Sequence, residues 1–483
     1  MPHAPEQLDL IAGARRRPEL KSGAMLCNPD TGEVLAEGLA SSATAVDEAL
    51  AAADEVHRSG VWNRLPLAER VARLHALADA VAAIAPGLAE PEALNTGIPI
   101  DVAGPMTGGL GGYFHGAAHF LQTQGEVEDR AGRHGRVQLH RAPRGPAVVI
   151  APWNAPAPCT IGRTAMALGA GCPVIVKPSE WAPFTADLFM EAMAAADLPP
   201  GLVQLVHGGA DVGAQLVADP RTRVVSFTGG LQAGRAIAAA AAPNFAALQL
   251  ELGGNNPAIV RADANIASAA AGLAAGMTKL NGQWCEAPGK ILVHRSLADE
   301  LVARLLDELE QRSFGSCLQP GTAIGPMSHR ARRDELVGRI AELVSAGATA
   351  HQVHRLPALR GWFVAPTVLT GLPSAAAVSE IFGPVVTVHA FDADDEAVAA
   401  ANEAGDGLAG FVFSADVDAA LAMGAQLRGG EVRINGTGLF DLCDGSTQSF
   451  WGTSGFGAHG DVQVFELFRG SRIVGEDDPG APM

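Results

Sequence analysis

The chain has 483 residues, 48% of them hydrophobic and 18% charged, and its formal net charge is −18. This length predicts two or three domains rather than one core, and 57 glycines and 31 prolines supply many turns. The acidic balance argues against nucleic acid or an anionic membrane as a partner, because both require a basic surface.

Signals for export, membrane insertion and metal binding are absent from the sequence. It contains no run of about 18 or more uninterrupted apolar residues, and its N-terminus lacks the basic-then-apolar layout of a secretory signal. Six cysteines, at positions 27, 159, 172, 285, 317 and 443, lack paired spacing. These features predict a cytoplasmic protein with free thiols, no membrane segment and no metal site.

The flanking segments predict an outer layer and a projecting hairpin. A turn at Asp30-Thr31-Gly32 lies between two short strands, and helical patterns cover 41–58, 67–85 and 113–122. Residues 126–142 predict a hairpin. The last patterned segment, 462–474, alternates loosely, so we expect a strand that pairs with this hairpin, followed by a frayed acidic tail over 475–483.

Between these segments, short apolar strands alternate with helices, which is typical of parallel, doubly wound sheets. The first set has strands at 147–150, 173–176, 202–206, 224–227 and 248–250, with helices at 160–170, 184–196, 211–218 and 232–241. The second set has strands at 258–260, 290–294, 363–369, 384–391, 408–414 and 431–435, with helices at 266–279, 297–312, 328–346 and 416–427. The predicted fold class is therefore α/β, with two units.

Polar and glycine-rich motifs follow the strands of the first set. They are Pro152-Trp153-Asn154, Lys177-Pro178-Ser179-Glu180, Thr228-Gly229-Gly230 and Glu251-Leu252-Gly253-Gly254. Ligands of doubly wound sheets bind at the carboxyl ends of the strands. We therefore expect these motifs to meet at one ligand-binding crevice.

Cys285 lies in a turn-rich segment directly before an apolar strand, and Glu251 heads its own glycine-rich turn upstream. A thiol that attacks and a carboxylate that later activates water are the groups a two-stage covalent mechanism requires. Either residue alone is more often structural. A cysteine hydrolase would need a histidine partner, and none of the fourteen histidines falls in a motif beside Cys285.

Taken together and in order, these motifs resemble the aldehyde dehydrogenase superfamily over roughly residues 20 to 475. The matching segments are Pro152-Trp153-Asn154, Val176-Lys177-Pro178-Ser179-Glu180, Phe227-Thr228-Gly229 with Gly234, Glu251-Leu252-Gly253-Gly254-Asn255, Gly282-Gln283-Trp284-Cys285 and Glu380-Ile381-Phe382-Gly383-Pro384. The resemblance implies a Rossmann-type cofactor domain, an α/β catalytic domain and a small β oligomerisation arm.

The resemblance also implies a role for each catalytic residue. Cys285 is the expected nucleophile, Glu251 the general base that activates water, and the Asn154 amide with the Cys285 N–H the donors to the oxyanion. The implied reaction is NAD(P)-dependent oxidation of an aldehyde to its acid. The alternatives are acyl transfer to coenzyme A, against which Glu251 argues, and a catalytically silent scaffold.

The expected cofactor is NAD, with NADP possible. A glutamate facing the ribose 2′-hydroxyl repels a 2′-phosphate, so Glu180 favours NAD. Glycines at the start of a helix allow a close approach of a diphosphate. The cofactor-binding residues that the resemblance implies are Pro152, Trp153, Lys177, Ser179, Glu180, Gly229, Gly230, Gly234, Leu252, Glu380 and Phe382.

The substrate-channel residues that we expect are Ala155, Trp284, Glu286 and Phe450. Small residues at Ala155 and Gly162, where the family often has bulky aromatics, predict a wide channel wall. Glu286, Asp441, Asp444 and His459 could make the mouth of the channel acidic, which would suit a cationic or polar aldehyde. Solvated loop residues are the simpler interpretation.

The resemblance finally implies domain boundaries and partners. Residues 1–125 and 143–252 would form the dinucleotide-binding domain, 253–455 the catalytic domain, and 126–142 with 461–476 the oligomerisation arm. The expected partners are a small-molecule aldehyde and copies of the chain in a homodimer or homotetramer.

Overall fold

Five parallel strands form the centre of an eight-stranded sheet in the computed structural model, which describes residues 4–353, 356–439, 442–443, 445–478 and 480. Their spatial order is β9 (Val203–Leu205), β8 (Val174–Lys177), β7 (Ala147–Ile150), β10 (Val224–Gly229) and β11 (Ala247–Leu252). The strand order reverses between β7 and β10, and the carboxyl ends of two such strands form the usual ligand-binding crevice.

Short antiparallel strands complete both edges of this sheet. At one edge β1 (Asp9–Ile11) pairs with β9 and with β2 (Ala14–Arg16), and at the other β22 (Gly455–Phe456) pairs with β11. These edge strands are too short to give a sequence pattern. The β22 pairing sets Gly455 opposite Glu251, so the C-terminal segment lies beside the predicted base.

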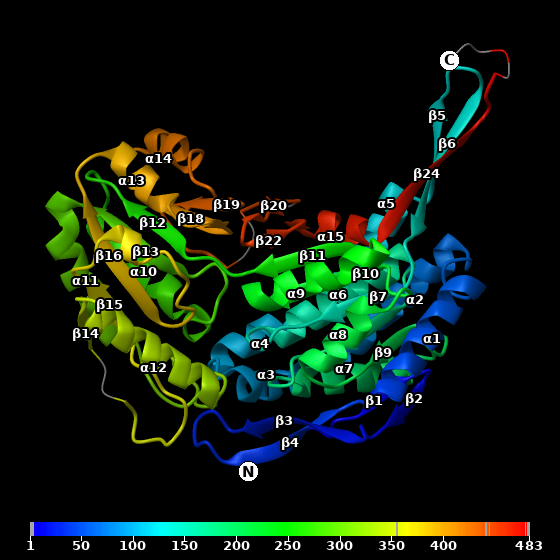
Figure 1. Cartoon of the computed structure of the whole chain (residues 1–483), viewed down its shortest axis with the longest axis horizontal. Coiled ribbons are helices and arrows are strands. Elements are labelled where there is room, and N and C mark those ends of the chain that lie inside the picture. The colour runs from blue at the N-terminus through cyan, green and yellow to red at the C-terminus, as the bar shows by residue number, and fades with distance from the viewer. Residues whose placement is uncertain (1–3, 354–355, 440–441, 444, 479, 481–483) are drawn as a thin grey trace.

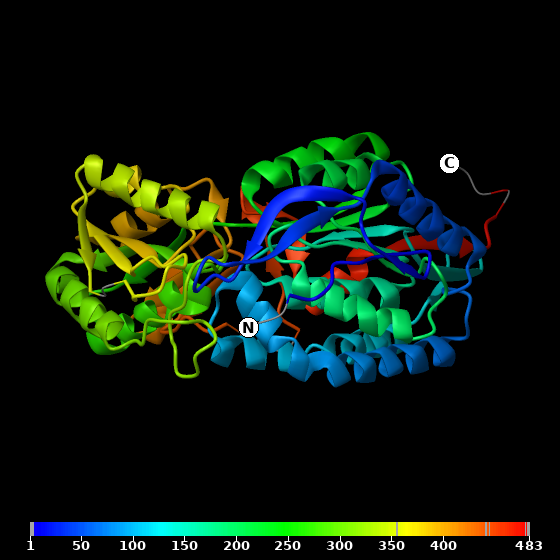
Figure 2. The ribbon, with the colours of Figure 1, turned by 90° about the horizontal axis from the view of Figure 1, so that it is seen from below.

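Helices cover both faces of this sheet (Figures 1 and 2). One core lies under α2 (Leu67–Ile84), α5 (Gly112–Gln124), α6 (Pro156–Ala170) and α7 (Phe184–Ala195); the other lies under α1 (Ala43–Ser59), α8 (Ala210–Ala218) and α9 (Leu231–Ala241). All seven predicted helices of this region are confirmed. Two further helices, α3 (Ala89–Thr96) and α4 (Ile100–Gly108), were not predicted.

The second body contains a seven-stranded sheet. Its order is β14 (Thr349–Gln352), β15 (Thr367–Thr370), β16 (Val385–Phe391), β13 (Pro288–His294), β12 (Asn256–Val260), β18 (Ala409–Phe413) and β19 (Glu431–Ile434), with only β14 antiparallel to its neighbour. Its helices are α10 (Ile266–Thr278), α11 (Ala298–Glu310), α12 (Arg330–Ser345), α13 (Asp394–Ala401) and α14 (Val417–Gly424). The predicted strand 363–369 begins only at Thr367, and α13 was not predicted.

The N-terminal hairpin is confirmed. Strands β3 (Leu20–Cys27) and β4 (Val34–Ala40) flank the predicted turn, which the Asn28 N–H closes by donating to the Glu33 carbonyl. Near the C-terminus, two small ladders pair β17 (Asp406–Gly407) with β21 (Trp451–Gly452), and β20 (Gln448–Ser449) with β23 (Ala458–His459).

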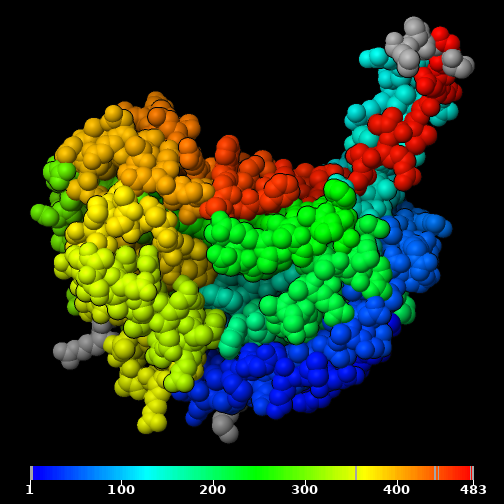
Figure 3. All heavy atoms as spheres, in the orientation of Figure 1, coloured from blue at the N-terminus to red at the C-terminus, as the bar shows by residue number. Residues whose placement is uncertain are grey.

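A three-stranded arm projects from the first body (Figures 1 and 3). Strand β6 (Arg136–Pro143) lies between β5 (Val127–Ala131) and β24 (Arg469–Gly475), so the predicted pairing of the C-terminal segment with the hairpin is confirmed. The prediction of a strand over all of 462–474 is wrong, because the first part of this segment lies in the helix α15 (Asp461–Leu467). Val464 and Phe465 of this helix, and Phe468 directly after it, lie on one helical face that is buried in the core.

Part of the predicted acidic tail lies outside the described residues, at 479 and 481–483. In the described part, Glu476 accepts a hydrogen bond from the Arg136 N–H at the tip of the arm. In the part of the chain that the structure describes, no single helix is long and apolar enough to cross a membrane, although one bent pair, Leu67–Gly87 with Ala89–Thr96, meets the length and composition criteria.

A buried ionic network ties the edge strand β1 to the sheet. His207, directly after β9, contacts Asp9 through Nδ1 and Asp187 through Nε2, both at 3.0 Å, and Ser41 donates to Asp9. Burial alone would lower the pKa of His207, but the two carboxylates outweigh it and raise the pKa to about 9. The histidine therefore carries a positive charge that holds β1 and α7 together.

We expect His207→Gln to destabilise the fold by about 3–5 kcal/mol near neutral pH, because it leaves two buried carboxylates without a cation. Since the folded pKa lies above the unfolded value, this contribution is complete below about pH 6.5 and is lost as the pH rises through about 9. Urea unfolding at about pH 7 and about pH 10 checks this, and the stability difference between wild type and variant should shrink at the higher pH. The exposed His134→Gln is the control; equal effects of both variants would contradict the assignment.

Candidate active site

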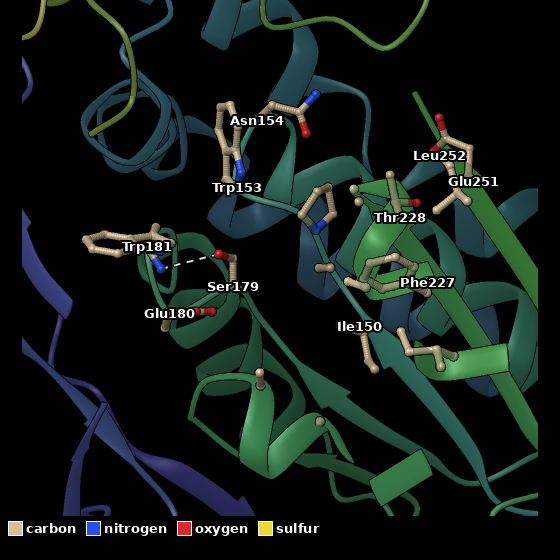
Figure 4. Close-up of a pocket in the computed structure, with 18 of the residues that line it drawn as sticks. Ile150, Trp153, Asn154, Ser179, Glu180, Trp181, Phe227, Thr228, Glu251 and Leu252 are labelled. Carbon is tan, nitrogen blue, oxygen red and sulfur yellow. Dashed lines mark hydrogen bonds between the residues drawn. The ribbon is translucent and has the colours of Figure 1, made fainter. Parts of the chain in front are cut away.

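A cavity of about 640 Å³ opens at the carboxyl ends of β7 and β10, where the strand order reverses. Figure 4 shows Trp153, Asn154 and Trp181 on one side of it and Thr228, Glu251 and Leu252 on the other. The predicted residues that line it are Pro152, Trp153, Asn154, Lys177, Ser179, Glu180, Gly229, Gly230, Glu251, Leu252, Cys285, Glu380 and Phe382. Tertiary folding thus brings together residues from six separate sequence motifs.

The loop that carries Cys285 has an unusual backbone. Three consecutive residues, Leu280, Asn281 and Gly282, have positive φ values of 48°, 59° and 75°. A non-glycine residue in this region costs on the order of 1–3 kcal/mol, so other contacts must hold the loop in place. The run reverses the chain just before Cys285, which points the cysteine toward the cavity.

Two side-chain amides hold this strained loop. Asn281 donates to the carbonyls of Gly97 and Pro326, at 2.7 and 2.8 Å, and accepts from the Gly325 N–H at 2.8 Å. Gln283 donates to Thr96 and accepts from the Ser328 N–H, both at 2.9 Å. Both amides are buried, so losing either would leave unpaired polar groups inside the protein.

The Cys285 thiol and the Glu251 carboxylate, which lies at the end of β11, both line the cavity, close enough for the charge of Glu251 to act on the thiol. Cys285 is accessible from the cavity, but surrounding protein desolvates it. Burial, and then the charges of Glu251 and Glu286, raise the pKa of this thiol well above its usual value. The resting nucleophile is therefore a thiol, which must lose its proton before it attacks.

Asn154 lies between β7 and α6 and points toward the cysteine loop. Its Nδ2 donates one hydrogen to the Gln283 carbonyl at 2.9 Å. Because the amide nitrogen carries two hydrogens, the second is left for another acceptor. The predicted oxyanion donor is thus fixed in orientation by the same loop that carries the nucleophile.

At one end of the cavity, Lys177 is buried and donates to the carbonyls of Pro178 and Gly208, at 2.9 and 2.7 Å. Burial lowers the pKa of Lys177, and Glu180, whose carboxylate lies 3.9 Å away, partly offsets this. Ser179 accepts from the Trp181 N–H. Glu180 remains partly exposed at the cavity wall, so it is available to a ligand.

Glycines shape the wall beside α9. Gly229 and Gly230 line the cavity where α9 begins, so the free N–H groups of its first turn face the space. Gly234 does not line it. A Cβ at Gly234 would lie 2.7 Å from the Leu252 side chain, so this glycine allows α9 to pack closely against β11.

Glu380 and Phe382 form the wall that comes from the second body. Glu380 faces the cavity and accepts from the Gly254 N–H at 3.2 Å. Glu380 is exposed, but nearby protein partly desolvates its carboxyl and raises its pKa to about 7 against the opposing effect of Gly254. The Phe382 ring meets Trp153 edge-on with centroids 5.4 Å apart.

The predicted channel residues lie outside this cavity. Trp284 is buried in an apolar cluster with Ile98 and Ala103, and the Lys279 ammonium lies 4.4 Å from its ring centre. Phe450 is buried too. Burial raises the pKa of Glu286 to about 7, partly offset by a hydrogen bond from Gln448. Ala155 precedes α6.

The expectation of a wide wall at Gly162 is wrong. A Cβ built at Gly162 would lie 3.4 Å from three ring atoms of Tyr113, so this ring from α5 fills the space. His459 contacts the buried Arg163 at 3.4 Å. The other two members of the predicted acidic mouth, Asp441 and Asp444, lie outside the described residues.

Sequence reasoning missed several residues of the cavity wall, among them Trp181, His329, Arg332 and Glu335. Trp181 follows the Lys177–Glu180 motif directly and could have been included on that ground. His329, Arg332 and Glu335 belong to the first turns of α12, and no local pattern separates them from other helix-surface residues. Among the described residues, no group of three or more His, Cys, Asp or Glu is placed to hold a metal ion.

The chain belongs to the aldehyde dehydrogenase family, whose model matches residues 17–473. Among curated relatives it is 36% identical to geranial dehydrogenase of Castellaniella defragrans over 81% of this chain and 83% of that protein. It is 33% identical to betaine aldehyde dehydrogenase of Rhizobium leguminosarum over 92% of both chains. A third relative is 2-hydroxymuconic semialdehyde dehydrogenase of a Pseudomonas strain, at 34% identity over 91% of this chain and 93% of that one.

Solved structures agree with this assignment. Betaine aldehyde dehydrogenase from Staphylococcus aureus in complex with NAD⁺ superposes with a TM-score of 0.92 at 28% identity, over 97% of this chain and 94% of that one. NAD-dependent aldehyde dehydrogenase from Sinorhizobium meliloti gives 0.91 at 31% identity, over 98% and 95%. The α/β fold class with an aldehyde-dehydrogenase architecture is therefore confirmed.

We expect Gly282→Ala to destabilise the protein by about 2–4 kcal/mol, because the new Cβ would lie close to the Gly383 backbone and φ is positive. That Cβ would be 2.1 Å from the Gly383 carbonyl carbon. Gly230→Ala is the matched control, since nothing lies within 4 Å of its Cβ. Thermal unfolding measures both, and equal stability of the two variants would contradict this view of the loop.

Proposed function

We propose that this chain oxidises an aldehyde to the carboxylic acid with NAD⁺ as the hydride acceptor. The observation that carries the proposal is that Cys285, Glu251 and Asn154 line one cavity of about 640 Å³ at the switch point of the first sheet. Family membership supports the reaction class. The buried side-chain amides of Asn281 and Gln283 hold the Cys285 loop in a strained conformation, which supports a catalytic rather than a purely structural role for this loop.

The residues of the cavity fit NAD⁺. The start of α9, with no side chain at Gly229 or Gly230, offers N–H groups to a diphosphate. Glu180 and Lys177 lie at one end, where they would bind the adenosine ribose, and Glu180 favours NAD over NADP. Glu380 would bind the second ribose and Phe382 would pack against the nicotinamide ring.

Bound NAD⁺ would supply a hydride acceptor, and the residues of the chain carry out the other steps. The Cys285 thiol releases its proton to solvent, and the sulfur attacks the aldehyde carbon. Asn154 and the Cys285 N–H stabilise the oxyanion of the resulting thiohemiacetal. After oxidation leaves a thioester, Glu251 removes a proton from the water that hydrolyses it.

Two other functions remain open to test. Acyl transfer to coenzyme A would not need a water-activating base, so the position of Glu251 beside the thiol favours hydrolysis. A silent scaffold would have no reason to keep Cys285, Glu251, Asn154 and Glu380 around one cavity. Equal turnover with and without coenzyme A would dismiss the acylating alternative.

We also propose that the arm joins copies of the chain into a homodimer or homotetramer. Its outer strands β5 and β24 have unpaired edges and exposed apolar side chains, among them Val127, Ile473 and Val474. We keep 1–125 with 143–252 as the dinucleotide-binding domain and 253–455 as the catalytic domain. The six free cysteines favour the cytoplasm as the compartment.

The direct test is an aldehyde panel with NAD⁺ and NADP⁺, followed by the absorbance of the reduced cofactor. Geranial, betaine aldehyde and 2-hydroxymuconic semialdehyde are suitable members, because relatives are named for them. Cys285→Ala should lower turnover by a factor on the order of 10⁴ or more, and Asn154→Ala by about 10²–10³. Turnover retained by folded Cys285→Ala protein would refute the mechanism.

Glu251→Gln separates the two chemical stages. The variant should release a burst of reduced cofactor close to one per active site and then stall, because the thioester forms but no base activates water. Rapid-mixing absorbance measures the burst, and mass spectrometry of the quenched protein detects the acyl adduct on Cys285. Steady turnover by this variant at the wild-type rate would rule out Glu251 as the base.

A further inference from the structure

The start of α12, with the preceding His329, contacts aromatic side chains from both bodies that line the cavity. His329 stacks flat on Trp181, with centroids 4.5 Å apart, and meets Trp153 edge-on at 5.3 Å. Three residues later, the Arg332 guanidinium lies 5.6 Å from the Phe382 ring centre. Residues 329–332 therefore contact Trp153 and Trp181 from the first body and Phe382 from the second.

The wall that carries Phe382 is strained. Phe382 has a φ of +47°, in the left-handed region that a bulky residue rarely adopts. Such a residue keeps this conformation only where the surroundings impose it. The strain lies in the turn that displays Glu380 and Phe382 to the cavity, so whatever imposes it also sets the position of both side chains.

Arg332 contacts this turn directly. Its Nη2 donates to the carbonyls of Ile381 and Phe382, at 2.5 and 2.8 Å, so one charged group holds both carbonyls next to the strained φ. The side chain is 12% exposed, and its Nη1 is paired with Glu335 at 2.6 Å. Glu335 thus fixes the guanidinium, which in turn binds the two carbonyls of the 380–382 turn.

The helix that carries Arg332 is itself fixed to the nucleophile loop. The Ser328 N–H donates to Gln283, and the Ser328 hydroxyl contacts His329 Nδ1 at 2.7 Å. On the other side, Gly282 packs against the Gly383 backbone. The turn at Phe382 is therefore connected to the cysteine loop both directly, by the Gly282–Gly383 contact, and through Arg332 and the start of α12.

We propose that Arg332 is a positioning residue that holds the Glu380–Phe382 turn in its left-handed conformation and so presents both side chains to the nicotinamide half of the dinucleotide. This inference rests on the proposed function. Arg332 does not touch the reacting atoms in this assignment; it acts through Glu380 and Phe382. Without the guanidinium, the turn relaxes and the cofactor loses two contacts at once.

The adjacent Arg333 provides a matched control. It has the same residue type on the same helix, but it pairs with Asp334 and lies 5.7 Å from the Trp362 ring, outside the cavity. Loss of helix propensity and of one positive charge is the same for both positions. Arg332, and not Arg333, donates to the carbonyls of the 380–382 turn.

The experiment measures NAD⁺ binding by calorimetry for wild type, Arg332→Met, Arg332→Lys and Arg333→Met. Arg332→Met should raise the Kd at least about tenfold and Arg333→Met by less than about twofold. Arg332→Lys should raise the Kd at least about threefold, because a point charge cannot reproduce the planar fork. Steady-state kinetics should show a higher KM for NAD⁺ with the KM for the aldehyde unchanged.

Chemical rescue separates positioning from a general loss of structure. Added ethylguanidine should restore NAD⁺ affinity to Arg332→Met and leave Arg333→Met unchanged. The inference is overturned if Arg332→Lys and Arg332→Met bind NAD⁺ as wild type does, if Arg333→Met weakens binding equally, or if ethylguanidine has no effect. If Arg332→Met does not fold, Arg332→Lys alone decides by its Kd. Failure of the wild type to bind NAD⁺ would instead refute the proposed function.

Discussion

The strained turn over Leu280, Asn281 and Gly282 is the constraint on which the active site depends. Three left-handed residues in a row form only because the buried amides of Asn281 and Gln283 connect the loop to α3 and to the segment before α12. The energy of these contacts stabilises a conformation that the isolated loop would not adopt. Cys285 is therefore placed before any substrate arrives, which reduces the reorganisation needed during reaction.

Both bodies of the protein contribute to the site. The switch point of the first sheet provides the crevice, while the second body provides Cys285, Glu380 and the start of α12. The chain crosses between the bodies directly after Glu251, from β11 to β12, so the base lies at the junction. Small shifts between the two bodies would separate the base from the thiol. Gln283 opposes such shifts, because it donates to Thr96 and its carbonyl accepts from Asn154, both in the first body.

Three carboxyl groups, Glu251, Glu286 and Glu380, surround the nucleophile and the inner part of the cavity. Desolvation raises the pKa of Glu286 and of Glu380 to about 7 and helps to raise the pKa of the Cys285 thiol. An additional negative charge beside Cys285 is therefore energetically unfavourable. A positively charged ring bound among these groups would relieve that cost and favour the thiolate, since an opposite charge nearby stabilises an ionised group.

The sequence by itself determined the fold class, most of the strands and helices of both sheets, and the motifs that meet at the cavity. It could do so because buried parallel strands are continuous apolar runs and because chemistry requires particular residue types at strand ends. Only the tertiary structure decided that Gly162 is covered by Tyr113, that 461–467 is a helix, that Trp284 packs into a core cluster, and that His329 and Arg332 join the cavity wall. Each of these depends on contacts between residues far apart in the chain. A local sequence pattern does not indicate which distant side chain packs against a given residue.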